Sequence, residues 1–245
     1  MSYLGIDIGG SGIKSALVDV DDGSLLSERF RVDTPQPATP DACAEVVAGH
    51  ILHHGYHGRL GVGFPAVVRH GTAESANNID QAWIGTSVAG VIGAATGLDV
   101  VVINDADAAA VAEAAFGAAK GVGGLVLTIT FGTGIGSGML VDGRLVPNLE
   151  LGQIELEGHS PAESFFSAKA RRTENLEWDE WGARANRYLR HVYAVFSPDL
   201  MVIGGGMAKH WDKYTDTLDE SLPLVPAALG NNAGLIGAAF MAAKA

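Results

Sequence analysis

Two glycine-rich segments, each placed directly after an apolar run, contain the residues whose types and spacing are best suited to chemistry. Residues 9–12 follow the run 3–8, and residues 132–138 follow the run 124–130. Glycine lets a ligand approach the backbone closely, and successive backbone N–H groups form an anion-binding nest. Neither segment ends in Gly-Lys-Ser/Thr, and strands are expected after both, unlike Walker A and dinucleotide-binding loops. A phosphate is therefore the ligand that we expect, with ordinary hairpin turns as the alternative.

Two charged residues flank the first glycine segment. Asp7 interrupts the first apolar run, and a buried carboxylate is costly unless it is paired, hydrogen-bonded or bound to a metal ion. Its place directly before the turn predicts a role near phosphate and Mg2+, while Lys14 is expected to contact a phosphate as a point charge. A purely structural ion pair between Asp7 and Lys14 is the alternative.

A third chemical segment is Asn104-Asp105-Ala106-Asp107, which ends an expected strand at 100–103 and opens an expected helix at 106–116. Ligands of α/β sheets bind at the carboxyl ends of strands. Asp105 is therefore a candidate general base that accepts a hydroxyl proton during phosphoryl transfer, with a helix N-cap as its alternative role. Asp107 competes for the same role, and spacing does not choose between the two.

The elements that must position these residues alternate between strands and helices, which predicts an α/β fold. Helices are expected at 42–54, 88–96, 106–116, 178–196 and 234–243. Strands are expected at 3–8, 16–20, 100–103, 124–130, 139–141, 144–146 and 200–203, with a strand-to-loop passage at 60–65. A strand, a glycine turn and a second strand occur near residue 3 and again near residue 124, which indicates a weak internal duplication and two lobes.

The composition excludes several classes of protein. With 47% hydrophobic and 18% charged residues, the 245-residue chain is not disordered. Its net charge of 16 − 28 = −12 argues against nucleic-acid binding. We see neither a membrane-spanning run nor a signal peptide, so no membrane partner and a cytoplasmic location are expected. Cys43 is the single cysteine and cannot build an internal disulfide or a cysteine-rich zinc site, so no structural zinc is expected.

A basic stretch stands out in this acidic chain. It contains six of the sixteen cations, which are Lys169, Arg171, Arg172, Arg184, Arg187 and Arg190. Such a stretch predicts a track for a long polyanion, bound through salt-sensitive electrostatics. The alternative is a solvated helix face with ion pairs to Glu174, Glu177 and Glu180.

Four segments together resemble the motifs of ROK-family sugar kinases. They are the first phosphate motif at 7–14, the catalytic-aspartate segment at 104–108, the second phosphate motif at 131–138 and the nucleotide-side glycine motif at 202–206. The resemblance extends over essentially the whole chain. It implies an α/β, actin/hexokinase/Hsp70-like (ribonuclease H-like) fold with two lobes and an interdomain cleft. The small N-terminal lobe would comprise 1–105 plus 234–245, and the larger C-terminal lobe 106–233.

Within that family, residues 78–85, 150–159 and 178–181 resemble the polyphosphate glucokinases. Those enzymes are compact ROK members that phosphorylate glucose from inorganic polyphosphate, often from ATP as well, and they lack the Cys/His zinc site of typical ROK proteins. The resemblance implies a sugar kinase whose cofactor is Mg2+ and whose phosphate donor is polyphosphate, ATP or both.

The resemblance also implies a role for each motif residue. Asp105 would be the base toward the 6-hydroxyl of glucose, and Asp7 would lie near Mg2+. The implied sugar contacts are Asn78, Asn104, Asp105, Glu150, Gln153 and Glu155. The implied donor-phosphate contacts are Gly9, Gly10, Ser11, Gly12, Lys14, Gly132, Thr133, Gly134, Gly205 and Gly206.

Two residues depart from the family pattern. Gln153 stands where the family has His, and an amide hydrogen-bonds but does not titrate. Ala66 stands where the family has Gly and would be strained at a positive φ. Both departures leave altered specificity, for mannose or another hexose, or a binding-only protein as alternatives.

A sugar-binding regulator of ROK type is a further alternative, disfavoured because the first motif begins near residue 5 without room for a DNA-binding helix-turn-helix. The apolar face expected on the helix 178–196 suggests a homodimer, the commonest assembly.

Overall fold

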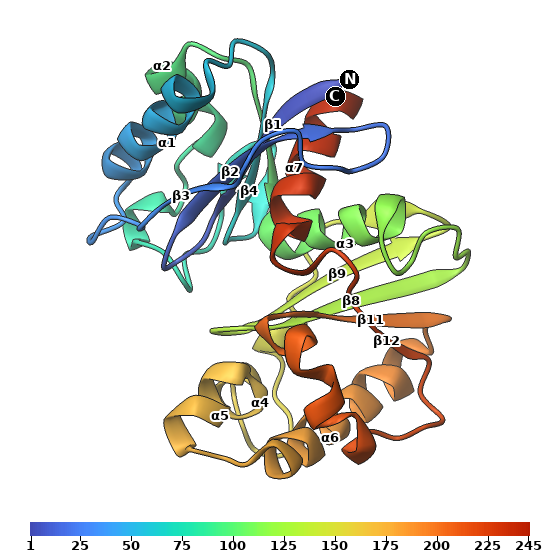
Figure 1. Ribbon diagram of the computed structural model, residues 1–245. Coiled ribbons are helices and arrows are strands. Elements are labelled where there is room, and N and C mark those ends of the chain that lie inside the picture. The colour runs from blue at the N-terminus through green and yellow to red at the C-terminus, as the bar shows by residue number, and fades with distance from the viewer. The chain divides into compact units, whose positions relative to one another are not determined.

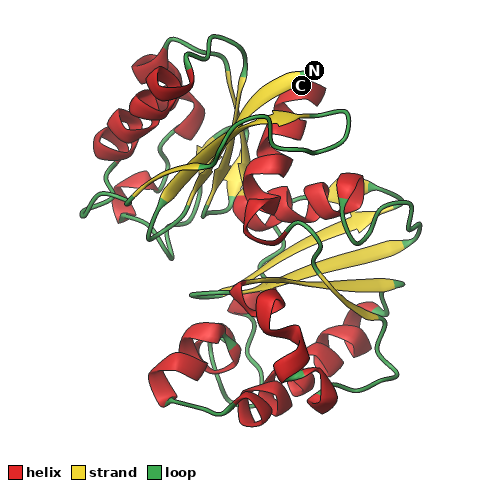
Figure 2. Ribbon diagram, viewed as in Figure 1, coloured by secondary structure: helices red, strands yellow, loops and turns green.

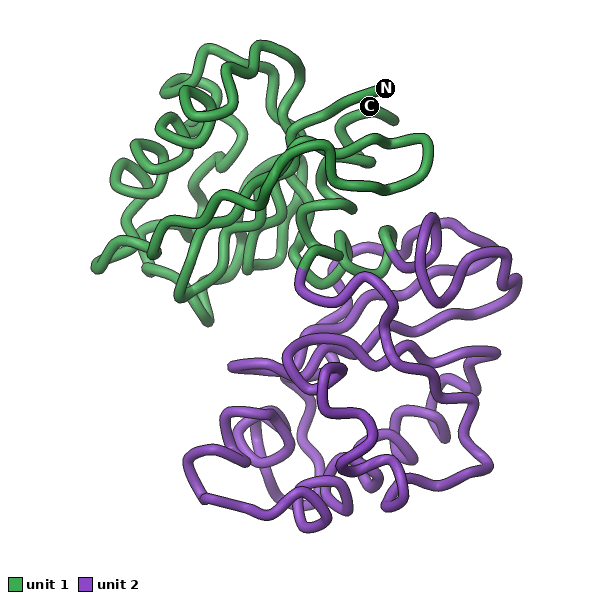
Figure 3. Tube along the Cα trace, viewed as in Figure 1, with its two compact units in different colours: residues 1–112, 232–245 green, residues 113–231 purple.

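The computed structural model describes residues 1–245 and divides into two compact units (Figures 1 and 3). Unit 1 comprises Met1–Ala112 and Asn232–Ala245, and unit 2 comprises Glu113–Asn231. The predicted lobes divided the chain at 105/106 and 233/234, whereas the units divide at 112/113 and 231/232. The first boundary falls inside a helix because the start of that helix packs on unit 1. A Cβ at Gly237 would collide with the backbone of Ala108.

Unit 1 is a five-stranded sheet with helices on both faces (Figure 2). The strand order is β3-β2-β1-β4-β7, with β1 Ser2–Ile8, β2 Ile13–Asp19, β3 Phe30–Val32, β4 Leu60–Phe64 and β7 Val100–Asn104. The hairpin strands β1, β2 and β3 pair antiparallel, while β1, β4 and β7 pair in parallel. The helices are α1 Pro40–His54, α2 Val88–Thr96, α3 Asp105–Phe116 and α7 Ala233–Lys244, and a small ribbon joins β5 Val68–Arg69 to β6 Thr72–Ala73. These elements match the predicted helices and strands closely.

Local sequence signals explain where the helices of unit 1 begin and lie. The Thr39 hydroxyl accepts the N–H of Ala42 at the start of α1, and Gly55 ends that helix in a left-handed conformation. Helix α7 packs on β1 and β4 at backbone distance because Gly5 and Gly61 have no side chain there. The two strand glycines are therefore what lets this helix cover the sheet so closely.

Unit 2 repeats the same strand order with different strands. Its sheet runs β10-β9-β8-β11-β12, with β8 Leu125–Phe131, β9 Ile135–Val141, β10 Arg144–Val146, β11 Leu200–Gly205 and β12 Leu224–Pro226. Again the first three strands pair antiparallel and the last two join in parallel. The predicted duplication is therefore present in the topology.

The helices of unit 2 are α4 Glu163–Phe166, α5 Ala168–Glu174 and α6 Trp178–Phe196. Unit 2 also contains three 3-10 turns. The turn η2, Leu151–Gln153, precedes α4, and η3 Gly206–Lys213 and η4 Thr215–Thr217 follow β11.

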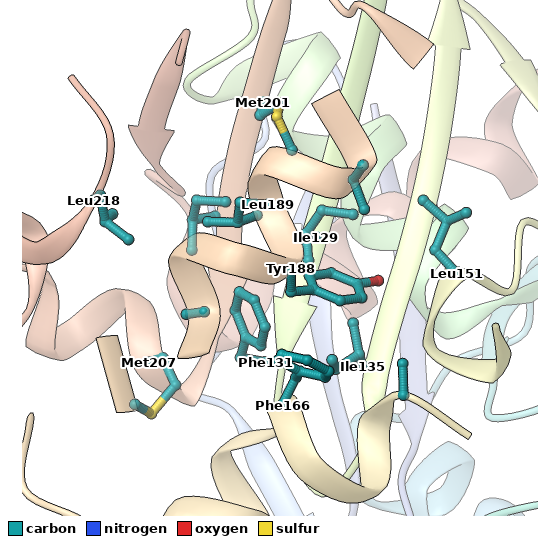
Figure 4. Close-up of a cluster of buried hydrophobic side chains, with 14 of the residues drawn as sticks. Ile129, Phe131, Ile135, Leu151, Phe166, Tyr188, Leu189, Met201, Met207 and Leu218 are labelled. Atoms are coloured by element: carbon teal, nitrogen blue, oxygen red, sulfur yellow. The ribbon is translucent and has the colours of Figure 1, made fainter. Parts of the chain in front are cut away.

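The core of unit 2 forms between its sheet and α6 (Figure 4). Trp181, Tyr188 and Leu189 of the helix are fully buried and pack with Phe131 of β8 and Phe166 of α4. The apolar face that suggested a homodimer is thus used inside unit 2, so a homodimer stays a prediction without that support. No helix has both the length and the apolar character needed to cross a membrane.

Candidate active site

The first chemical pair lies at the carboxyl edge of the unit 1 sheet. Asp7 of β1 and Lys14 of β2 are register partners, and their Oδ2 and Nζ atoms are 3.1 Å apart. Asp7 and Lys14 therefore form the ion pair that was expected as the alternative. The two side chains stay 15% and 25% exposed, so the pair is open to a ligand.

The turn between β1 and β2 presents backbone groups beside this pair. The N–H of Gly9 bonds the carbonyl of Gly12 at 3.1 Å, and Arg31 of β3 donates to the carbonyl of Ser11 at 3.0 Å. A Cβ at Gly10 would lie 2.9 Å from the carbonyl oxygen of Asn78, and one at Gly12 would meet the Arg31 side chain. None of these glycines has a left-handed φ. They are needed for close approach rather than for an unusual turn.

Asp105 lies on the same sheet edge as Asp7. Strands β1, β4 and β7 are parallel, with Asp7 opposite Gly63 and Phe64 opposite Asn104, so their carboxyl ends meet. A Cβ at Gly63 would lie 3.8 Å from both the Asp105 Cα and the Asp7 Oδ1 atom. The structure thus brings the two predicted carboxylates to either side of Gly63.

The residues around Asp105 differ in burial and in hydrogen bonding, which bears on the two roles that the sequence left open, general base and helix N-cap. Asn104 caps α3, because its Oδ1 accepts the N–H groups of Ala106 and Asp107 at 2.9 and 3.0 Å. Its amide donates to the carbonyl of Ala66 at 3.0 Å, so backbone groups occupy both ends of the side chain. Asp107 is 1% exposed, whereas Asp105 is partly exposed. Asp105 is the carboxylate that a ligand can reach.

Ala66 fits its position without strain. It is 4% exposed and has no positive φ, so the missing glycine costs nothing in backbone conformation here.

In unit 2, two glycine turns lie side by side at the carboxyl edge of the sheet. Gly132 donates its N–H to the carbonyl of Gly134 at 2.9 Å, and Thr133 between them is exposed. Gly205 of β11 is the register partner of Phe131, with a φ of 73° and no room for a Cβ against the Phe131 backbone. Gly206 follows and is exposed. The parallel pairing of β8 and β11 brings these predicted donor residues together.

The segment 149–153 lies against the second glycine motif. The Ser137 hydroxyl of β9 donates to the carbonyl of Leu149 and accepts the N–H of Leu151 at 3.0 Å. Glu150 precedes η2, and its pKa is raised, first by burial and then by the nearby charge of Glu163. Gln153 is exposed and donates to the Glu163 Oε1 atom at 2.9 Å.

Three residues of this region were missed by the sequence analysis. Arg31 contacts the first turn, Ser137 holds the segment 149–153, and Glu163 contacts the second turn. Ser137 was inside the motif that we identified, but no pattern indicated its partner. Glu163 follows the irregular stretch 154–162. The one local signal that could have indicated it is an acidic residue in the first turn of the short helix α4. Glu155, which was predicted as a sugar contact, is exposed.

The basic stretch is divided by ion pairs. Arg184 pairs with Glu174, Arg187 with Glu157 and Arg190 with Asp219, at 2.7, 3.0 and 3.2 Å. All three cations of α6 are paired, as the alternative expected, but only Glu174 is a partner that it named, since Glu157 and Asp219 take the places of Glu177 and Glu180.

The cations of α5 differ from those of α6. Lys169 and Arg172 are exposed and lie outside the ion pairs, and Arg171 stacks 3.7 Å over the Trp178 ring. The N–H of Lys169 donates to the carbonyl of Gly132 at 3.0 Å, so α5 begins at the second glycine turn.

Known proteins resemble this chain in both sequence and fold. A polyphosphate glucokinase of Mycobacterium tuberculosis (strain CDC 1551 / Oshkosh) is 44% identical over 238 residues, which cover 97% of this chain and 89% of the relative. The structure of an inorganic polyphosphate/ATP-glucomannokinase from Arthrobacter sp. strain KM superimposes with a TM-score of 0.96 at 48% identity, covering 99% of this chain and 98% of the other.

More distant relatives share the fold. A ROK family glucokinase from Streptomyces griseus, solved with glucose and AMPPNP, gives a TM-score of 0.87 at 25% identity, with both chains fully covered. This match confirms the predicted α/β fold of actin/hexokinase type, while the interdomain cleft stays a prediction. The model of the ROK family matches residues 3–163, which include both phosphate motifs and the Asp105 segment. The chain belongs to the ROK family.

Proposed function

We propose that this chain is a kinase that transfers a phosphoryl group from inorganic polyphosphate or ATP to the 6-hydroxyl of glucose. The observation that carries the proposal is the position of Asp105, a reachable carboxylate on the same sheet edge as the Asp7–Lys14 pair. Relatives named polyphosphate glucokinase and polyphosphate/ATP-glucomannokinase support this reaction and both donors.

In the proposed reaction Asp105 is the general base. Its carboxylate accepts the proton of the 6-hydroxyl while that oxygen bonds to the terminal phosphorus of the donor and the bond from phosphorus to the bridging oxygen breaks. Glucose 6-phosphate forms, and the donor leaves as ADP or as polyphosphate shortened by one unit. The burial of Asp107 makes it the weaker candidate.

The proposed sugar contacts are those that the family resemblance implies, Asn78, Asp105, Glu150, Gln153 and Glu155. Carboxylates and amides suit vicinal hydroxyls because each can form several hydrogen bonds. Asn104 supports Asp105 through the helix cap, and its direct sugar contact is the weakest of these assignments because backbone groups occupy its side chain.

The donor phosphates are assigned to the glycine turns. The first comprises Gly9, Gly10, Ser11 and Gly12 with Lys14, and the second Gly132, Thr133 and Gly134 with Gly205 and Gly206. Mg2+ is held in such sites by one or two carboxylates together with the phosphates, and it neutralises the charge of the donor. Asp7 fits this role as a partly exposed carboxylate with one oxygen on Lys14.

The polyphosphate track is proposed in a shorter form than the sequence predicted. Lys169 and Arg172 are proposed to bind the polyanion because both are exposed and lie outside the ion pairs. The helix α5 that carries them begins at the Gly132 turn, and Arg171 lies between them in the sequence. Arg184, Arg187 and Arg190 are assigned to ion pairs with carboxylates of unit 2 instead.

Mannose is a second candidate acceptor. The Arthrobacter relative, 48% identical, is a glucomannokinase by name, and Gln153 already departs from the family histidine. Glucose and mannose differ in the orientation of one hydroxyl, which the proposed carboxylate and amide contacts can accommodate.

A coupled assay tests the proposal. Purified protein with Mg2+ is given glucose or mannose, each with polyphosphate and with ATP, and the hexose 6-phosphate formed is measured. Turnover of glucose with either donor supports the kinase, and the donor ratio shows whether α5 serves polyphosphate. Absence of turnover with both sugars and both donors contradicts it and favours a binding-only protein.

A further inference from the structure

We propose that Arg184 is a positioning residue for the phosphate donor, and that it acts by holding helices α4 and α5 in place beside the second glycine turn. Arg184 lies on α6, whose apolar face packs in the core of unit 2. Its guanidinium contacts both of the shorter helices, although the sequence analysis placed this cation in a polyanion track. That the glycine turn binds the donor rests on the function proposed above.

The ion pair between Arg184 and Glu174 fixes the end of α5. Two hydrogen bonds join the side chains, from Nη1 to Oε1 at 3.1 Å and from Nη2 to Oε2 at 2.7 Å. Such a bidentate pair sets the direction of the contact as well as its length. The Arg184 side chain is 15% exposed, which shields the pair from solvent, whereas Arg190 on the same helix is exposed. Glu174 is the last residue of α5, so the pair holds that end of the helix on α6.

The same guanidinium holds α4. Nη1 of Arg184 also donates to the carbonyl of Phe165 at 3.3 Å, and the guanidinium carbon lies 3.8 Å from the centre of the Phe165 ring. His159 stacks on this ring with a centroid distance of 3.8 Å and an interplanar angle of 7°. Two groups so close to the ring centre cannot share one face, so Phe165 lies between them. Arg184 thereby fixes α4 together with the loop that precedes it.

Helices α4 and α5 are bonded in turn to the second glycine turn. At the start of α4, Glu163 accepts the N–H of Ile135 at 2.9 Å. At the start of α5, the N–H of Lys169 donates to the carbonyl of Gly132 at 3.0 Å. The two helices therefore contact both ends of the turn, and Arg184 contacts both helices. A change at Arg184 is expected to reach the turn through them.

Three roles of Arg184 differ in what its loss would do to the two donors. A positioning role weakens the binding of both, because ATP and polyphosphate present their phosphates to the same backbone groups. A role as one charge of a polyanion track weakens the long polyanion alone, most strongly at low salt. A role in stability alone lowers the melting temperature and leaves both donor affinities unchanged.

Two substitutions at this position distinguish these roles. Arg184→Met keeps an apolar side chain over Phe165 but removes every N–H group, and Glu174 is exposed, so no buried charge loses its partner. Arg184→Lys keeps the positive charge but replaces the planar fork by a single ammonium group. Arg190→Met, which removes a paired cation of the same helix, is the matched control.

The expected results are specific to positioning. In Arg184→Met the KM for ATP and the KM for polyphosphate rise together by about tenfold, the size typical of lost hydrogen bonds to a charged group. The value of kcat at saturating donor changes less, because the proposed base Asp105 lies in unit 1. Arg184→Lys recovers only part of both KM values. The control stays within about twofold of the wild type, as expected for an exposed pair.

Binding measurements separate this inference from the kinase reaction. Calorimetric titrations with a non-hydrolysable ATP analogue and with tripolyphosphate need no turnover. If the wild type binds both probes without turnover and Arg184→Met binds them more weakly, the proposed reaction is wrong and the inference holds. If the wild type binds neither probe, both are wrong.

Other outcomes overturn the inference alone. They are a loss confined to polyphosphate that Arg184→Lys restores in full, and donor affinities that stay at the wild-type values in Arg184→Met. If Arg184→Met fails to fold by circular dichroism, Glu174→Gln decides, since it removes one of the two bonds at an exposed residue. A rise in both donor KM values in that variant supports the inference, and unchanged values overturn it.

Discussion

The two glycine turns of this molecule share one topology and differ in the side chains around them. Each turn joins the two central antiparallel strands of a sheet whose strand order is the same in both units. The unit 1 turn lies beside an Asp7–Lys14 ion pair, with Asp105 on the same edge of the sheet. The unit 2 turn contacts a single carboxylate, that of Glu163, which accepts from its backbone.

This difference indicates a division of labour within a duplicated fold. Unit 1 gathers charged groups that can move a proton and neutralise phosphate, as a reacting centre requires. Unit 2 uses the Glu163 charge to hold the backbone of its own glycine turn, which suits a surface that binds rather than reacts. Altering the carboxylates of unit 1 is therefore expected to lower kcat most, and altering the glycine turn of unit 2 to weaken binding most.

The largest effect is expected from Asp105→Asn. The amide keeps the shape of the side chain but accepts no proton, so kcat should fall by about 10²–10⁴-fold, the usual contribution of a general base. Steady-state assays with glucose and each donor measure this loss. Asp107→Asn is the comparison variant, and a larger loss of kcat in that variant than in Asp105→Asn would move the base to Asp107.

A smaller effect, on stability and donor binding together, is expected from Gly134→Ala. The added methyl group displaces the Glu163 carboxylate from Ile135, which should cost about 1–3 kcal/mol, the range for a disrupted hydrogen bond to a charged group. Urea unfolding measures the change. Gly132→Ala is the matched variant, since its Cβ would lie 4.0 Å from the nearest heavy atom outside its chain neighbours. If both variants lose the same free energy of unfolding, the loss does not come from displacing Glu163.

A still smaller effect, confined to one donor, is expected from removing the cations of α5. Lys169→Ala with Arg172→Ala should raise the KM for polyphosphate several-fold at low salt and leave the KM for ATP nearly unchanged, because a long polyanion reaches beyond the glycine turn. Arg187→Ala with Arg190→Ala is the paired control. If the control raises the polyphosphate KM as much, the longer track that the sequence predicted is correct.

The smallest effect concerns the pH dependence of stability in unit 1. Burial, followed by the charges of His54 and His53, lowers the pKa of His50 from 6.5 to about 4. The unfolded chain then binds more protons between pH 6.5 and 4, so the His50 contribution to stability is lost as pH falls through that window. The Ser15 hydroxyl lies 2.6 Å from the His50 Nδ1 atom. His50→Asn keeps an amide near that hydroxyl and should flatten the pH dependence of the melting temperature. A slope identical to that of the wild type would contradict this.

The sequence predicted most of the fold and the placing of Asp7 and Asp105 at strand ends of unit 1, and fewer of the contacts of unit 2. Asp7 and Asp105 were found because strand ends meet at a sheet edge, which local patterns reveal. The length of α6 followed from its apolar stripe, although Val195 on that stripe is 61% exposed. The glycines were expected to let a ligand approach the backbone, but in the two glycine turns they also allow close approach to Asn78, Arg31 and Glu163. Such contacts join residues far apart in sequence and leave no periodic signal.

The ion pairs of the basic stretch were hidden for the same reason. Arg187 and Arg190 pair with Glu157 and Asp219, about thirty residues before and after them, whereas a helix pattern reveals only partners three or four residues apart.

Glucose binding by the Asp105→Asn protein tests the central claim most directly. Calorimetric titration compares this variant with the wild type, using the same preparations whose turnover has been measured. If Asp105 is the base, the variant binds glucose with a Kd within a few-fold of the wild type while its turnover is lost. If glucose binding weakens in proportion to turnover, Asp105 holds the sugar rather than taking its proton, and the division of labour between the two units is wrong.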